Sequence, residues 1–199
     1  MTTQKANGKE VSHLVFGPQF SFYRKPVWNT IPLKAISLYD AYAYITGDYA
    51  KEQTEHLRSI PDKKAADAYK VKNFDYVTFG GTFTVRDDEH LILPSDLLCL
   101  DFDHVPNVQM YRNQFLADPE FETALMFTSP SGQGIKWIVP IRTCCHTYQQ
   151  IFAAVTNYVK ATYGLIPDQK CKDISRACFL PHDPQAYINP KYVPFNAQR

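Results

Sequence analysis

Two aspartates separated by one residue end an apolar run in the middle of the chain, where residues 98–104 are Leu-Cys-Leu-Asp-Phe-Asp-His. Residues two apart in a strand point to the same face, about 6.5 to 7 Å apart, so the carboxylates of Asp101 and Asp103 repel each other unless a cation lies between them. Carboxylate oxygens are the ligands that Mg²⁺ and Mn²⁺ prefer. The spacing predicts a divalent metal site; alternatively, the strand simply ends here and both carboxylates meet water or a helix N-terminus.

A second segment places small residues between two apolar stretches and reads Ser-Pro-Ser-Gly-Gln-Gly-Ile-Lys. Its serines offer hydroxyl groups, its glycines let backbone N–H groups approach an anion closely, and its lysine adds a positive charge at the same rim. The segment is typical of a phosphate-binding hairpin, but an ordinary glycine turn has the same composition. The predicted phosphate ligands are Ser129, Ser131, Gly132, Gly134 and Lys136.

A third segment carries one carboxylate and one guanidinium just before an apolar stretch at 177–181. Asp173 could supply the third carboxylate of a two-metal site, and Arg176 can bind a phosphate through two parallel hydrogen bonds. The alternative is that Asp173 and Arg176 pair with each other on a surface turn. The three segments together are more specific than any one of them.

Hydrophobic periodicity and capping signals indicate the elements that must position these residues. Predicted helices lie at 38–46, 49–59, after Pro61, at 107–117 and at 147–163. Predicted strands lie within 76–86, hinged at the glycine pair 80–81, and at 97–102, 124–129, 135–141 and 177–181. We therefore expect one α/β (α+β) domain over 1–199, a mixed sheet covered by helices, with a mainly helical part at 1–73 and the sheet at 74–199.

Composition excludes several classes of protein. The 199 residues are 45% hydrophobic and 14% aromatic, enough for one substantial core. No apolar stretch approaches the roughly 20 residues of a membrane span, and residues 1–10 lack the apolar segment of a secretory signal, so we expect a cytoplasmic protein without membrane contact. Five cysteines without a C-x-x-C pair predict neither a disulfide framework nor zinc, and the spacing of Cys171, Cys178 and His182 matches no common zinc module.

Charge is balanced overall, at +1, but is distributed unevenly along the chain. Residues 87–122 are strongly acidic, whereas Lys170, Lys172 and Arg176 form a basic group near the C-terminal end. Folding could bring the two zones together and hold metal ions next to phosphates. The other interpretation is that these charges are solvated surface groups.

The three motifs in this order resemble those of the archaeo-eukaryotic primase superfamily, the primase-polymerases. Its second motif usually has a histidine where this chain has Lys136, a residue that can still bind a triphosphate. A wider resemblance is to the N-terminal domain family of virulence-associated protein E (VirE)-type proteins of mobile elements. It rests on the segments 79–83, 97–105, 127–141, 158–165 and 173–190.

These resemblances imply a primase-polymerase-like fold with an RRM-like catalytic half, and DNA replication of a plasmid, phage or transposon. They imply that Asp101, Asp103 and Asp173 hold two Mg²⁺ or Mn²⁺ ions that activate a 3′-hydroxyl and stabilise the leaving pyrophosphate. Lys136, Arg176 and the serine-glycine turn would bind a nucleoside triphosphate. The implied partners are single-stranded DNA template and a downstream helicase or primase-associated domain in a longer protein.

Other functions remain open at this point. A primase-like domain without catalysis would only bind nucleotides or nucleic acid. Phosphatases of the haloacid-dehalogenase type also begin with D-x-D, but they need a later acidic pair, and manganese-dependent glycosyltransferases would not explain the second and third motifs. Template contact would need a basic groove with aromatic faces, for which Tyr23, Arg24, Lys25 and Trp28 are candidates, although in a chain this aromatic such residues more often serve core or surface packing.

Overall fold

The computed structural model describes residues 17–197, so the expectation about residues 1–10 lies outside the described part. The α-helices are α1 (Leu38–Thr46), α2 (Lys51–Ser59), α3 (Lys63–Asn73), α4 (Val108–Leu116) and α5 (Tyr148–Tyr163). The strands are β1 (Gln19–Tyr23), β2 (Lys34–Ser37), β3 (Tyr76–Thr78), β4 (Gly81–Phe83), β5 (Leu91–Pro94), β6 (Leu97–Phe102), β7 (Leu125–Thr128), β8 (Ile135–Pro140), β9 (Cys178–Phe179) and β10 (Tyr187–Ile188). None of the helices in this part is long and apolar enough to cross a membrane.

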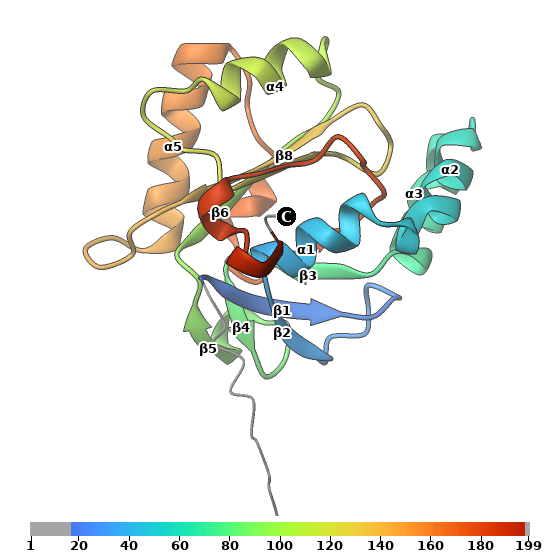
Figure 1. Ribbon diagram of the computed structural model, residues 1–199, viewed down its shortest axis with the longest axis horizontal. Coiled ribbons are helices and arrows are strands. Elements are labelled where there is room, and N and C mark those ends of the chain that lie inside the picture. Colours follow the sequence, from blue (N-terminus) through green and yellow to red (C-terminus); the bar gives the residue numbers. More distant parts are fainter. Residues whose placement is uncertain (1–16, 198–199) are drawn as a thin grey trace, which may run out of the picture.

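The strands form two four-stranded sheets, in the orders β2-β1-β3-β9 and β10-β7-β8-β6, and a separate β4-β5 pair. Every strand pair within 17–197 is antiparallel. The predicted α+β class is confirmed, with antiparallel sheets in place of one mixed sheet. Figure 1 shows α4 and α5 on one side of β6 and β8, β1 to β5 on the other side, and α2 beside α3 at one end.

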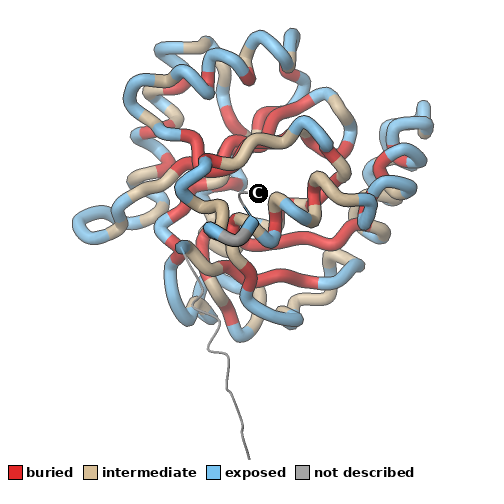
Figure 2. The backbone as a smooth tube through the Cα atoms, viewed as in Figure 1, coloured by how far each residue is buried: buried red, intermediate tan, exposed pale blue. Residues whose placement is uncertain are grey.

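Both faces of the β6–β8 sheet are buried, and each face packs on its own core (Figure 2). Because strand side chains alternate, Leu98, Leu100 and Phe102 face the core under α4 and α5. The intervening residues of β6, which include Leu97 and Asp101, point to the opposite face, where the first sheet and α1 pack. The fold therefore directs Asp101 into the space between the two sheets.

Between residues 17 and 73, the helices α1, α2 and α3 cover more of the chain than the strands β1 and β2, and these two strands were not predicted. The helix predicted at 38–46 is confirmed, and a capping box between Ser37 and Asp40 begins it. By contrast, β1 is short and pairs with β3 more than fifty residues later, so its strand conformation depends on a partner that local periodicity does not reveal. The same reason applies to β10, which pairs with the distant β7 and also lacks a sequence prediction. The strand β5 pairs with the nearby β4 and was not predicted either.

We expect Phe115→Ala in α4 to lower the free energy of unfolding by about 3–5 kcal/mol. Phe115 is fully buried and stacks on Trp137 with ring centroids 4.4 Å apart. The neighbouring Leu116 is 42% exposed, so Leu116→Ala should change stability by less than about 1 kcal/mol. Urea unfolding followed by circular dichroism measures both variants, and equal losses would contradict this account of the core.

Candidate functional site

Asp101 and Lys136 form a cross-strand ion pair in the space between the sheets. They are direct partners in the β6–β8 register, and the ammonium Nζ of Lys136 contacts Oδ2 of Asp101. The side chain of Lys136 is only 9% exposed and that of Asp101 only 14%. Burial alone would lower the pKa of Lys136, but the attraction of Asp101 outweighs it and raises the pKa above its usual value. Lys136 is therefore a charged, buried group that neutralises part of Asp101.

The second carboxylate oxygen of Asp101 has no such partner. Its Oδ1 is buried and, among the described residues, makes no hydrogen bond. A buried acceptor without a donor is costly, and a hard cation is one group that would satisfy it. This unpartnered oxygen fits the metal that the D-x-D spacing predicts.

One group of three potential metal ligands in the described part includes this carboxylate. Ligand atoms of Asp101, Asp168 and Cys171 all lie within 4.8 Å of one another. Burial, together with the charge of Asp101, raises the pKa of the Cys171 thiol to about 12. The thiol is therefore neutral at physiological pH, and the two carboxylates are the better ligands for Mg²⁺ or Mn²⁺.

Asp168 is held beside Asp101 by its backbone and its side chain. Its N–H donates to the carbonyl oxygen of Asp101 at 2.8 Å. Its carboxylate caps the short 3₁₀ helix Gln169–Lys172 by accepting from the N–H of Lys170 at 3.1 Å, and it accepts from the guanidinium of Arg176 at 2.8 Å. Sequence reasoning missed Asp168, because an aspartate after proline signals only a turn or a helix cap.

Asp173, the predicted third carboxylate, has a different place. It follows the 3₁₀ helix, and its carbonyl oxygen accepts the N–H of Arg176 at 2.9 Å. Asp173 belongs neither to the group of potential metal ligands around Asp101 nor to the residues that line the nearby cavity. Among the described residues, Asp168 is therefore the carboxylate that accompanies Asp101.

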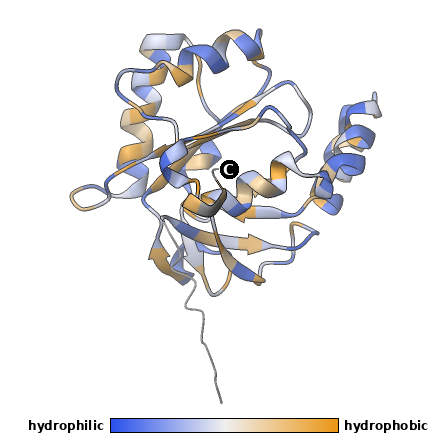
Figure 3. Ribbon diagram, viewed as in Figure 1, coloured by the Kyte–Doolittle hydropathy of each residue, from blue (hydrophilic) through white to orange (hydrophobic). Residues whose placement is uncertain are grey.

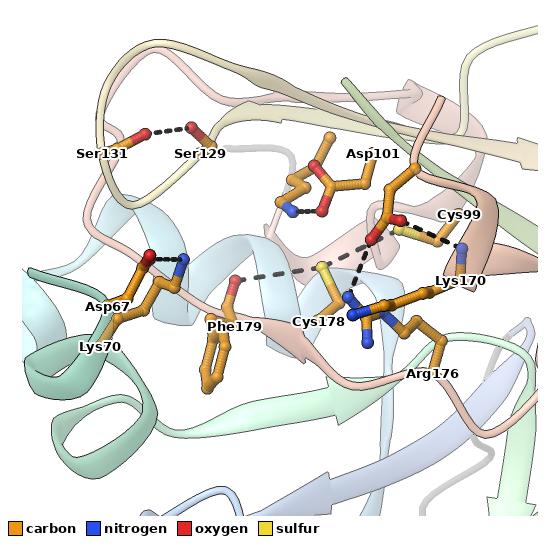
Figure 4. A network of polar contacts seen from close by, with 12 residues as sticks. Asp67, Lys70, Cys99, Asp101, Ser129, Ser131, Lys170, Arg176, Cys178 and Phe179 are labelled. Atoms are coloured by element: carbon orange, nitrogen blue, oxygen red, sulfur yellow. Dashed lines mark hydrogen bonds and ion pairs between the residues drawn. The ribbon is translucent and has the colours of Figure 1, made fainter. Parts of the chain in front are cut away.

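A small cavity of about 100 Å³ joins the predicted motifs, between the end of β6, the β7–β8 turn, α3 and the start of β9. Figure 4 shows this network, in which Arg176 and Lys70 approach from different elements. Three carboxylates, three cations and two hydroxyls line this cavity, where Asp101 and Asp103 of the acidic zone meet Arg176 of the basic group. The charged and hydroxyl residues are Asp101, Asp103, Asp168, Lys70, Lys136, Arg176, Ser129 and Ser131.

The glycines of the β7–β8 turn shape this cavity without lining it. The N–H of Gly132 donates to the carbonyl oxygen of Ser129 at 2.9 Å, so this predicted anion donor is already used inside the turn. Gly132 has a φ of 81°, which favours glycine. At Gly134, a Cβ atom would collide with the carbonyl oxygen of Phe102. The hydroxyls of Ser129 and Ser131 lie 3.1 Å apart (Figure 4).

The candidate template contacts near residue 23 lie in different surroundings. Tyr23 is fully buried and stacks on Tyr76 at 4.7 Å. Arg24 pairs with Asp75 at 2.8 Å. Trp28 is 63% exposed. Tyr23 therefore belongs to the core and is not accessible to a template, whereas Arg24 lines a separate cavity of about 340 Å³ between β1, β2 and α1.

Comparison with known families gives a match over the second part of the chain. A family model described as "BT4734-like, N-terminal domain" matches residues 69–188, which is more than half of the chain. This match is not to a VirE-type or primase-polymerase family, so the family resemblance suggested by the motifs is wrong. No curated protein and no solved structure matches the chain significantly.

We expect Lys136→Met to lower the free energy of unfolding by about 3–5 kcal/mol in EDTA, because it leaves the buried Asp101 charge without its partner. The double variant Asp101→Asn/Lys136→Met should recover a large part of this loss, since it removes both charges. Urea denaturation of wild type, both single variants and the double variant measures the coupling. If the loss of stability in the double variant equals the sum of the losses in the two single variants, the two side chains do not stabilise each other.

Proposed function

The chain belongs to the BT4734-like N-terminal domain family. For this member of the family we propose, from the residues of its site, that the domain is a metal-dependent nucleotidyltransferase. It would transfer a nucleotide from a nucleoside triphosphate or deoxynucleoside triphosphate to a 3′-hydroxyl on a single-stranded DNA template. One observation carries the proposal: three carboxylates and three cationic side chains line the same small cavity. Carboxylates suit divalent ions and cations suit phosphates, so the combination supports binding of a metal–polyphosphate complex.

The carboxylates Asp101, Asp103 and Asp168 would hold Mg²⁺ or Mn²⁺. The unpartnered Oδ1 of Asp101 and the fixed position of Asp168 support this assignment. When bound, such ions would activate the attacking hydroxyl and neutralise negative charge on the leaving pyrophosphate. Asp103 follows β6, is exposed and lines the same cavity, so it would add an oxygen ligand at the mouth of that cavity.

Arg176 and Lys70 are the phosphate ligands best supported by their surroundings. The Arg176 side chain is 40% exposed, and one of its nitrogens binds Asp168, which leaves other N–H donors free for phosphate oxygens. Lys70 lines the cavity from α3 and pairs with Asp67 at 3.0 Å. The hydroxyls of Ser129 and Ser131 are further donors at the opposite wall.

A second candidate function is nucleotide or nucleic-acid binding without catalysis. The observation that favours it is the direct ion pair, because the ammonium of Lys136 already neutralises one oxygen of Asp101. The site then needs less positive charge from a divalent ion. The mobile-element setting and the downstream helicase or primase-associated partner rested on the corrected family resemblance, so we do not propose them.

We expect the wild-type protein to extend a primer on a single-stranded template with labelled nucleotides and Mn²⁺ or Mg²⁺. Asp101→Asn and Asp168→Asn should each reduce the rate at least about 100-fold, because each removes a metal-ligating carboxylate. Asp173→Asn is the matched control and should stay within about threefold of wild type, since Asp173 does not line the cavity. Gel electrophoresis of the products measures all four proteins.

Two other outcomes would change the conclusion. If wild type makes no product but binds nucleotide in a metal-dependent way that Asp101→Asn abolishes, the non-catalytic function replaces the transferase. A loss of activity in Asp173→Asn equal to that in Asp168→Asn would contradict the choice of carboxylates.

A further inference from the structure

A second, larger cavity of about 480 Å³ adjoins the site, between α2, α3, the loop after β6 and the β7–β8 turn. It shares Lys70, Asp103 and Ser131 with the small cavity, so the two cavities lie next to each other. The small cavity alone, at about 100 Å³, is too small for a whole nucleotide, whereas pockets of about 300–1,000 Å³ hold small ligands.

The lining of the larger cavity has the mixed character that a sugar and a base require. Figure 3 shows α2 and α3 as mostly hydrophilic, yet their facing residues add apolar surface. The apolar residues are Leu57, Ile60, Pro61 and Ala66. Planar and polar groups come from Arg58, His104 and Gln133, which can stack on a base or form hydrogen bonds with it.

Two walls of this cavity are preorganised by contacts within the protein. Arg58 donates from Nε to the carbonyl oxygen of Pro130 at 3.2 Å, so α2 is tied to the turn that carries Ser131. Val105 donates its N–H to the carbonyl oxygen of Gln133 at 2.9 Å, which ties the loop after β6 to the same turn. His104 has a φ of 53°, an unusual conformation for a residue other than glycine. These contacts fix the loop whose neighbouring Asp103 faces both cavities.

We propose that this larger cavity, the α2–α3 groove, binds the sugar and base of the nucleoside triphosphate whose phosphates bind in the small cavity. The inference rests on the proposed function, because it takes the small cavity as the phosphate site. The shared residues Lys70, Asp103 and Ser131 lie where phosphate and sugar meet. Contacts of the groove with the sugar and base then increase the affinity for a nucleoside triphosphate. Inorganic tripolyphosphate has neither group and cannot make these contacts.

The test compares ATP with inorganic tripolyphosphate by isothermal titration calorimetry, with Mn²⁺ present in both titrations. Wild type should bind ATP at least about tenfold more tightly than tripolyphosphate, a difference of about 1.4 kcal/mol. Ala66→Phe fills the groove and should remove this tenfold difference while leaving tripolyphosphate affinity within about twofold. Ala68→Phe is the matched control on the same helix, because Ala68 is exposed and does not line the groove.

His104→Gly provides a second variant that keeps the fold, because glycine accepts the positive φ at this position. It should weaken ATP binding several-fold and leave tripolyphosphate binding unchanged. Circular dichroism and thermal unfolding of each variant verify that it is folded.

The outcomes separate this inference from the proposed function. Equal affinity of wild type for ATP and tripolyphosphate overturns the groove assignment but leaves the phosphate site intact. If Ala66→Phe spares ATP and instead weakens binding of a single-stranded oligonucleotide, the groove holds a nucleic-acid strand and the inference is wrong. If neither ATP nor tripolyphosphate binds, the phosphate site itself is refuted, and the groove assignment is refuted with it.

Discussion

The antiparallel pairing of β6 with β8 is the constraint on which the site depends. Its register sets Asp101 opposite Lys136, and side-chain alternation directs both away from the α4–α5 core into the space between the sheets. A shift of β6 by one residue would turn Asp101 into the core under α4 and α5 and would turn Leu98, Leu100 and Phe102 out of it. The hydrophobic pattern that stabilises the sheet therefore also determines where the two charges lie.

Segments far apart in the sequence complete the site around this pair. The 3₁₀ helix after α5 brings Asp168, whose N–H binds the carbonyl oxygen of Asp101. The Gly134 position, which has no room for a side chain, lets the β7–β8 turn pack closely against the end of β6. Arg58 then ties the turn to α2. Backbone contacts thus bring these segments together, and direct side-chain pairs such as Asp101–Lys136 and Asp168–Arg176 connect the polar groups of the site.

Sequence patterns predicted most of the helices and the strands of the β6–β8 region, because these elements have strong local periodicity and clear caps. Within the site, Asp101, Asp103, Ser129, Ser131, Lys136 and Arg176 were predicted and do line one cavity. Lys70 and Asp168 were missed, since one lies on a polar helix and the other at a turn, where charged residues are common. Their places depend on tertiary packing of α3 and the 3₁₀ helix, which the motif spacing does not encode.

The balance of charge at the site bears on which ligand it suits. A free anion would approach Lys70, Lys136 and Arg176 but also meet three carboxylates, and a free cation would meet the ammonium of Lys136 beside Asp101. A metal–polyphosphate complex brings both charges together, so its anionic part can lie toward the cationic residues and its cationic part toward the carboxylates. The ion pair between Asp101 and Lys136 keeps the unliganded site close to electrically neutral, which limits the desolvation cost of burying either residue. When the complex binds, the carboxylates pair with its metal ion and the cationic side chains pair with its phosphates, in place of pairing with each other. For this reason we favour a nucleoside triphosphate with its metal ion over a lone ion as the ligand.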